Sequence, residues 1–128
     1  MKLLSPAISS LARMRLWRIE AWKNNPLDAQ REVLQDLVTS AQYTEFGRKY
    51  NFSNLFNVRD FKTAVPISNY DDMKFYIERI MHGEQNILWN TPIYWFAKSS
   101  GTTSDKSKFI PVSDESLQDC HFKASKDV

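Results

Sequence analysis

The sequence contains a single cysteine, Cys120, so disulfide bonds within the chain cannot hold its fold. Only 3 of its 128 residues are glycine and 5 are proline, which excludes collagen-like chains and low-complexity linkers. No apolar run approaches the roughly 18 residues that predict a membrane-spanning helix. Lys and Arg total 17 against 15 for Asp and Glu, and a net charge of +2 is too small to indicate nucleic-acid binding. We therefore expect no nucleic-acid partner, no membrane span and a cytoplasmic location.

The residues that are abundant are typical of a globular chain. The sequence is 42% hydrophobic and 13% aromatic, whereas disordered chains are poor in aromatic residues. The apolar start of the chain is interrupted at Ser5-Pro6 and again at Ser9-Ser10, and Arg13 follows closely. A secretory signal needs a longer continuous apolar stretch, so we expect none here.

Two long amphipathic helices are predicted at the start of the chain. Ser5 is placed to cap the first, with Pro6 at its first position. The tripeptide Asn24-Asn25-Pro26 separates the first helix from the second. Apolar faces are expected to consist of Leu4, Ile8, Leu11, Ala12, Ile19 and Trp22 in the first helix, and of Leu27, Leu34, Leu37, Val38 and Ala41 in the second.

Three shorter helical segments are predicted next, so that residues 1–90 are mainly helical. A helical turn carrying Gly47 is expected over residues 44–50. Asn57 is placed to cap a helix over Val58–Ala64, which Pro66 ends. Ser68 or Asn69 caps a further helix, which Gly83 ends in a left-handed conformation. The apolar face of that helix is expected to consist of Tyr70, Met73, Ile77, Ile80 and Met81.

Residues 91–112 are predicted to form a strand, a loop and a second strand, with the strands over residues 92–97 and 107–112. Ser113 then caps a helix that continues through residue 128. We expect Cys120 to be buried, and the aromatic side chains near the first strand to be core residues: Trp89, Tyr94, Trp95 and Phe96.

The fold class is therefore α/β, or α+β for this segment taken alone. Two strands need further strands to bury both faces of a sheet. We expect residues 1–128 to be the N-terminal part of a single large domain in a longer protein. The alternative is a small complete α+β domain in which the strands pack on the preceding helices.

The loop between the strands, residues 98–108, carries the most informative chemistry. It holds five hydroxyl side chains and Gly101 between Ser99 and Ser104, and lysines at positions 106 and 108. A phosphate group needs several converging donors and a cation, and glycine lets the backbone approach closely. The loop is not a Walker A motif, which needs a second glycine before its lysine and a helix after it. From composition alone, a solvated hairpin loop remains the alternative.

Two stretches of this region resemble the phosphate-binding motif of adenylate-forming enzymes: Ser99-Ser100-Gly101-Thr102-Thr103 and Lys108-Phe109-Ile110-Pro111. In detail they resemble the auxin-responsive (Gretchen Hagen) family of acyl acid-amido synthetases. Residues 65–72 and 76–80 resemble the helix that precedes this loop in the family. Members usually carry glycine where Asp105 stands, and a carboxylate near a triphosphate is repulsive unless it points away or meets a metal.

The resemblance implies an activity for the full-length protein. Such enzymes use ATP to activate a carboxylic acid as an acyl-adenylate, and an amine or amino acid then takes the acyl group. Mg²⁺ is expected to accompany ATP, and no carboxylate of this chain is assigned to it. The adenine, acyl and amine pockets are expected beyond residue 128, so this segment alone is expected to be inactive. The resemblance implies ATP-binding roles for Ser99, Ser100, Gly101, Thr102, Thr103 and Lys108.

The first helix supports a different class of function. Residues 2–23 contain five basic side chains and one acidic side chain, together with Trp17 and Trp22. This composition is found in helices that lie on anionic membranes or bind a partner. However, Arg15 falls within the apolar face and Trp17 lies opposite it. A non-catalytic helical module is therefore the alternative hypothesis.

The remaining chemistry-bearing residues suggest no further site. Cys120 and His121 are adjacent on a predicted helix, so their side chains point about 100° apart and make a poor nucleophile–base pair. No cysteines and histidines have the spacing of a zinc site. His82 is expected at a helix end, where a positive charge suits the helix dipole.

Overall fold

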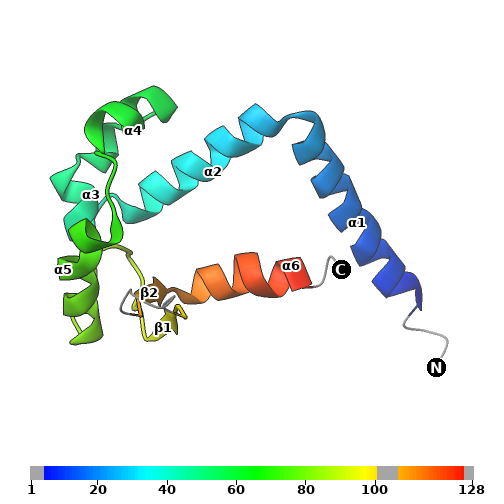
Figure 1. Cartoon of the computed structure of the whole chain (residues 1–128). Helices are drawn as coiled ribbons and strands as arrows, with labels where there is room; N and C mark the ends of the chain where they lie inside the picture. The colour runs from blue at the N-terminus through cyan, green and yellow to red at the C-terminus, as the bar shows by residue number, and fades with distance from the viewer. Residues whose placement is uncertain (1–4, 101–106, 126–128) are drawn as a thin grey trace.

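The computed structural model describes residues 5–100 and 107–125. Figure 1 shows a mostly helical chain with one two-stranded sheet, as the predicted fold class requires. Helices α3, α4 and α5 gather on one side, while α1 and α2 extend away from them and the final helix runs from the sheet back toward α1. None of the helices in the described part of the chain combines the length and apolarity that crossing a membrane requires.

Helices α1 (Ser5–Asn24) and α2 (Pro26–Ala41) meet at the predicted boundary, with Pro26 in the first turn of α2. The prediction for the apolar face of α1 was wrong at both positions that can be judged. Ile19 is 36% exposed and Trp22 is 55% exposed, because no side chain among the described residues 13–24 of α1 belongs to either hydrophobic core.

The apolar stripe of α2 is buried only at its C-terminal end. Val38 and Ala41 are buried as predicted, and Leu34 packs partly against them. Leu27 and Leu37 are exposed, contrary to the prediction. Leu27 lies near the start of α2, far from the C-terminal end where α2 meets α3 and η1. Leu37 lies at that end but is not packed against the core; it lines a cavity with Leu88 and Trp89.

Helix α3 (Glu45–Lys49) packs closely against the end of α2. Its cap, Thr44, is completely buried; the Oγ1 atom accepts a hydrogen bond from the Gly47 N–H (2.9 Å) and donates one to the Ala41 carbonyl (2.7 Å). A β-carbon at Gly47 would lie 2.0 Å from that same carbonyl oxygen. Glycine is therefore needed here for close approach of two backbone segments, and the predicted turn over residues 44–50 is confirmed.

Helices α4 (Val58–Ala64) and α5 (Tyr70–Met81) begin where their caps predict. The Asn57 side chain accepts hydrogen bonds from the first N–H groups of α4. The Asn69 side chain accepts from the Asp72 N–H (3.1 Å), and the Asp72 carboxylate accepts from the Asn69 N–H (2.8 Å), which completes a capping box. Gly83 follows α5 with φ = 96°, as predicted for a left-handed helix terminus.

Two small hydrophobic cores hold these elements together. The first joins α2 to the short helix η1 (Phe52–Asn54), and the second joins α5 to the segment that leads into the sheet. Phe46 and Trp89 pack against both. The buried residues are Val38, Ala41, Phe52 and Leu55 in the first core, and Tyr76, Ile80, Ile87 and Ile93 in the second.

The predicted apolar face of α5 differs from the observed one at two positions. Tyr76 was not included in the prediction, but it belongs to the second core. Met81 was included, but its side chain is 44% exposed.

The sheet consists of β1 (Trp95–Lys98) and β2 (Phe109–Val112), which pair antiparallel with Trp95 opposite Val112. Both strands begin later than predicted. Ile93 is instead a buried residue whose N–H donates to the Gln85 side chain (2.9 Å). Tyr94 is 71% exposed and Trp95 is 63% exposed, so their assignment to the core was wrong, because the two described strands cover neither side chain.

The final helix starts after Ser113, whose Oγ accepts a hydrogen bond from the Ser116 N–H (3.1 Å), as predicted. Its middle is π-helical (η2, Ser116–Phe122), and α6 (Lys123–Ser125) continues it. Glu115 ties its first turn to the core through hydrogen bonds from the Trp89 Nε1 (3.3 Å) and the Thr91 hydroxyl (3.0 Å). Beyond that point the helix leaves the cores, so Cys120 is exposed and its predicted burial was wrong.

Candidate nucleotide-binding site

The two ends of the predicted phosphate loop lie side by side at the end of the hairpin. The Ser99 N–H donates to the Lys108 carbonyl (2.9 Å), and the Lys108 N–H donates to the Ser99 Oγ (3.1 Å). These bonds extend the pairing of β1 and β2 by one residue pair. The structure thereby brings Ser99 and Lys108 together, although they are nine positions apart.

The interior of the predicted loop, residues 101–106, lies outside the described residues. The roles assigned to Gly101, Thr102 and Thr103 stay predictions, and so does the consequence of Asp105. Within the described residues, Ser100 is exposed beside the half-buried Ser99. The Ser99 oxygen accepts a backbone hydrogen bond, which is compatible with its hydroxyl donating a hydrogen bond to a phosphate oxygen.

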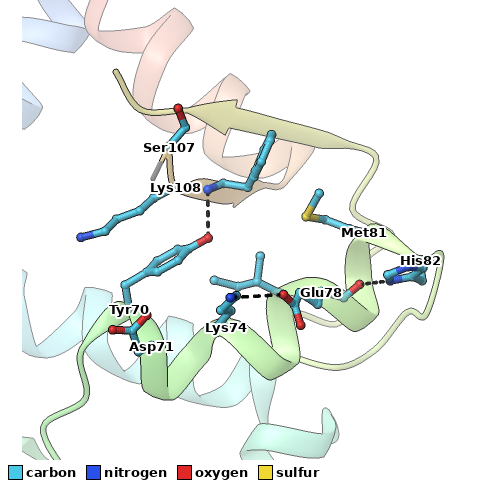
Figure 2. Close-up of a pocket in the computed structure, with 10 residues that line it drawn as sticks. Tyr70, Asp71, Lys74, Glu78, Met81, His82, Ser107 and Lys108 are labelled. Carbon is cyan, nitrogen blue, oxygen red and sulfur yellow. Dashed lines mark hydrogen bonds and ion pairs between the residues drawn. The ribbon is translucent and has the colours of Figure 1, made fainter. Parts of the chain in front are cut away.

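A cavity of about 620 Å³ separates α5 from the beginning of β2, and Lys108 lies on its wall (Figure 2). Its lining mixes apolar and charged side chains. The Lys74 ammonium lies 3.7 Å from the Glu78 carboxylate, so those two charges largely compensate each other. The residues that line the cavity are Tyr70, Asp71, Lys74, Ile77, Glu78, Met81, His82, Ser107, Lys108 and Phe109.

Tyr70 connects α5 to the residues that follow the loop. Its hydroxyl oxygen accepts a hydrogen bond from the Phe109 N–H (3.0 Å), and the Lys108 Nζ lies 5.6 Å from the centre of its ring. The sequence predicted only that Tyr70 belongs to the apolar face of its helix. No local sequence pattern predicts the contact between Tyr70 and Phe109, because they are 39 positions apart.

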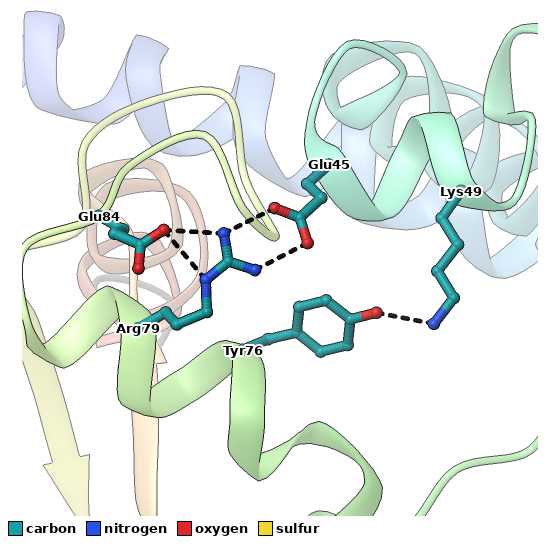
Figure 3. Close-up of polar contacts among 5 residues, drawn as sticks. All are labelled: Glu45, Lys49, Tyr76, Arg79 and Glu84. Atoms are coloured by element: carbon teal, nitrogen blue, oxygen red, sulfur yellow. Dashed lines mark hydrogen bonds and ion pairs between the residues drawn. The ribbon is translucent and has the colours of Figure 1, made fainter.

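A cluster of polar side chains fixes α5 against α3 (Figure 3). The Arg79 guanidinium binds both carboxylate oxygens of Glu45 (2.8 Å each) and also binds Glu84 (2.7 Å). Hydrogen bonds from Arg79 lower the pKa of Glu45 and that of Glu84, while the same bonds raise the pKa of Arg79. One turn away, the Lys49 ammonium donates to the Tyr76 hydroxyl (2.8 Å). The cluster supports the helix that carries Tyr70.

The described residues contain no group of three or more His, Cys, Asp or Glu side chains that could hold a metal ion. The predicted involvement of Mg²⁺ stays a prediction. His82 ends α5 as predicted, and its Nδ1 lies 2.7 Å from the Glu78 carbonyl oxygen. Because a carbonyl oxygen only accepts, Nδ1 carries the hydrogen of that bond.

The surface of α1 bears on the alternative function. Trp17 is 71% exposed, and the Arg15 guanidinium donates to the backbone carbonyl of Lys123 in the final helix. Exposed tryptophan is compatible with membrane or partner binding, but nothing in the structure specifically favours it. That hypothesis stays a prediction.

Comparison with protein families gives one match across most of the chain. Residues 15–127 match the family described as the GH3 family N-terminal domain. Among curated proteins, the indole-3-acetic acid-amido synthetase GH3.4 of Arabidopsis thaliana is 32% identical over 114 residues, which cover 88% of this chain. The jasmonoyl–L-amino acid synthetase JAR6 of Nicotiana attenuata is 34% identical over 104 residues, which cover 78% of this chain.

Solved structures give the same match in three dimensions. The GH3.15 acyl acid amido synthetase superposes with a TM-score of 0.75 at 30% identity over 86% of this chain. The same enzyme in complex with 2,4-DB superposes with a TM-score of 0.66 at 31% identity over 75% of this chain. The chain corresponds to only 19% and 18% of the length of the two curated relatives and to 20% of the first of these structures.

Proposed function

Because this chain belongs to the GH3 family, as the family's N-terminal domain, we propose that the full-length protein is an ATP-dependent acyl acid-amido synthetase. It activates a small carboxylic acid and joins it to an amine or amino acid. The matched relatives are named as amido synthetases of indole-3-acetic acid and as a jasmonoyl–amino acid synthetase, which indicates the class of acid to test first.

The proposed reaction has two steps. A carboxylate oxygen of the acid attacks the α-phosphorus of ATP and displaces pyrophosphate, which leaves an acyl-adenylate. The amine nitrogen then attacks the acyl carbon, the amide bond forms, and AMP leaves with its oxygen while the nitrogen loses a proton. A free carboxylate is a poor electrophile, whereas the adenylate oxygen is a good leaving group. The protein contributes mainly by positioning the reactants and neutralising their charge.

The hairpin end is the proposed binding site for the ATP phosphates. The observation that carries this assignment is the pairing of Ser99 with Lys108, which places a hydroxyl and a lysine at the two ends of one loop. We assign hydroxyl donors to Ser99, Ser100, Thr102 and Thr103, close backbone approach to Gly101, and charge neutralisation to Lys108. Mg²⁺ would be held by phosphate oxygens and waters and would offset part of the triphosphate charge.

The decisive experiment measures acid-dependent exchange of pyrophosphate into ATP by the full-length protein. The acids include indole-3-acetic acid, jasmonic acid and 2,4-DB, together with unrelated alkyl and aryl acids. We expect exchange with at least one acid, and AMP formation once an amino acid is added. Failure to bind ATP, or ATP binding without exchange for any of these acids, contradicts the proposal.

The Lys108→Ala variant tests the assignment of the site. A charge-assisted hydrogen bond contributes roughly 1.5–3 kcal/mol, so exchange should fall about ten- to more than a hundredfold. Lys98→Ala is the matched control, because it removes the same charge from the same hairpin and Lys98 lies over the Phe109 ring (5.9 Å to the ring centre). The control should change exchange less than about threefold. A similarly small loss in Lys108→Ala would refute its role, and Lys106 would be the next residue to test.

A further inference from the structure

Tyr70 makes two separate contacts with the segment that follows the phosphate loop (Figure 2). Its hydroxyl accepts the Phe109 N–H at 3.0 Å, which fixes the backbone immediately after Lys108. Its ring lies 5.6 Å from the Lys108 Nζ, within the roughly 6 Å over which an ammonium is attracted to an aromatic face. One side chain therefore restrains both the backbone and the charged end of the lysine segment.

The position of Tyr70 is itself well fixed. It is the first residue of α5 and lies within the Asn69–Asp72 capping box, directly after Asn69, and its side chain is half-buried on the cavity wall. The Arg79 ion pairs with Glu45 and Glu84 hold the same helix against α3 and the following loop. The Lys108 side chain is thereby contacted by a residue of α5, a helix that ion pairs hold in place.

We propose that Tyr70 is a positioning residue for Lys108, which it holds at the place where the ATP triphosphate is bound. The inference rests on the proposed function. It adds to the site a residue that lies outside the loop motif, and it assigns separate roles to the hydroxyl and the ring of that residue. The hydroxyl fixes the backbone of residue 109, and the ring limits the directions available to the lysine ammonium.

The two contacts can be removed separately. Tyr70→Phe keeps the ring and removes the hydrogen-bond acceptor, while Tyr70→Leu removes both. Tyr76→Phe is the matched control: it removes a tyrosine hydroxyl from the same helix, but that hydroxyl accepts from Lys49 in α3 and does not contact the hairpin. The control separates a loss of helix packing from a loss of lysine positioning.

The first measurement is the dependence of acid-dependent pyrophosphate exchange on ATP, in the full-length protein. The loss of one cation–π contact and one neutral hydrogen bond predicts that Tyr70→Leu raises the KM for ATP about five- to fiftyfold. The KM for the acid should change less than about twofold, and Tyr70→Phe should lie between wild type and Tyr70→Leu. Equal increases in the two KM values would overturn the proposal, because general loosening of the fold would produce them.

The second measurement is a double-mutant cycle with Lys108→Ala. If Tyr70 acts through Lys108, then Tyr70→Leu should add less than about twofold to the loss already caused by Lys108→Ala. Losses that multiply would show that Tyr70 acts independently of Lys108 and would overturn the proposal. If Tyr76→Phe lowers pyrophosphate exchange at all, its loss should multiply with the loss caused by Lys108→Ala.

The third measurement needs no nucleotide and keeps the inference distinguishable from the proposed function. Acetic anhydride labels lysines according to their accessibility and freedom, and mass spectrometry quantifies each site. Labelling of Lys108, relative to the exposed Lys62, should rise about twofold or more in Tyr70→Leu and stay unchanged in Tyr76→Phe. Unchanged Lys108 labelling in Tyr70→Leu overturns the positioning role. If the wild-type protein shows no pyrophosphate exchange but Tyr70→Leu shows the expected rise in Lys108 labelling, the proposed function is refuted, while the positioning of Lys108 by Tyr70 is supported.

Discussion

Replacing Gly47 with alanine tests how closely α3 packs against the end of α2. A β-carbon there would lie 2.0 Å from the Ala41 carbonyl oxygen and 2.9 Å from its carbonyl carbon. Carbon atoms in contact are ordinarily about 3.5–4.0 Å apart, so the two backbone segments must separate by roughly 1 Å or more. The same carbonyl accepts hydrogen bonds from the Thr44 N–H (3.0 Å) and the Thr44 hydroxyl (2.7 Å). The movement therefore disturbs those bonds as well.

The size of the effect follows from these contacts. Overpacking a well-packed site costs about 1–3 kcal/mol, and each disturbed hydrogen bond about 0.5–1.5 kcal/mol. The obstacle at Gly47 is a main-chain carbonyl, which cannot rotate away as a flexible side chain does. We therefore expect a local destabilisation of about 3 kcal/mol, which corresponds to a roughly hundredfold increase in local opening.

Hydrogen exchange followed by mass spectrometry measures that opening in the full-length protein. Peptides covering residues 41–50 should exchange roughly a hundredfold faster in Gly47→Ala than in wild type. Gly83→Ala is the control: Gly83 has φ = 96° and an added β-carbon would meet no atom within 4 Å, so only backbone strain of about 1–2 kcal/mol is introduced. Exchange in Gly47→Ala no faster than in wild type would refute the steric argument. So would an increase no larger than the one Gly83→Ala causes around residue 83.

Three further predictions address the loop, the cap and the ion pairs. Replacing Thr102 and Thr103 together with valine should weaken ATP binding at least about tenfold while AMP loses much less affinity, and equal losses on titration would show that the loop does not contact the outer phosphates. Thr44→Val should leave the buried Gly47 N–H without its acceptor and speed exchange of α3 about five- to more than a hundredfold, whereas Thr44→Ser keeps the acceptor and should change exchange far less. The carboxylates bound by Arg79 have pKa values below their usual 4.5, so they stabilise the fold above that pH and lose this contribution as pH falls through the lowered values. Arg79→Gln should therefore lower the thermal unfolding midpoint at pH 7 more than at pH 3.5, and an equal shift at both pH values would contradict this.

Elements that depend on neighbouring residues could be predicted from the sequence. Asn57 and Asn69 cap the helices that follow them, and Gly83 adopts the expected left-handed conformation, because each signal acts within about four residues. Burial was less predictable. Leu37 has the right spacing for the apolar stripe of α2, but whether a position is covered depends on where other elements pack.

In the candidate site, too, local features could be predicted from the sequence and tertiary contacts could not. The strand–loop–strand pattern predicts that the two ends of the loop meet, and Ser99 does pair with Lys108. The contact from Tyr70 to Phe109 joins a helix start to a strand start, and no spacing rule relates the two. Such a contact is visible only once the tertiary structure is known.

The hairpin has two chemically unequal edges. Ser99 donates its N–H to Lys108 across the hairpin, and hydrogen-bonded pairs alternate with non-bonded pairs in an antiparallel ladder. Phe109 and Pro111 therefore occupy non-bonded positions, so their backbone nitrogens face away from β1. The outward N–H of Phe109 already donates to the Tyr70 hydroxyl, and Pro111 has no backbone N–H. The outer side of β2 thus has no N–H left to donate to another strand, which protects it from edge-to-edge association. A third strand can extend this sheet with a full ladder only beside β1.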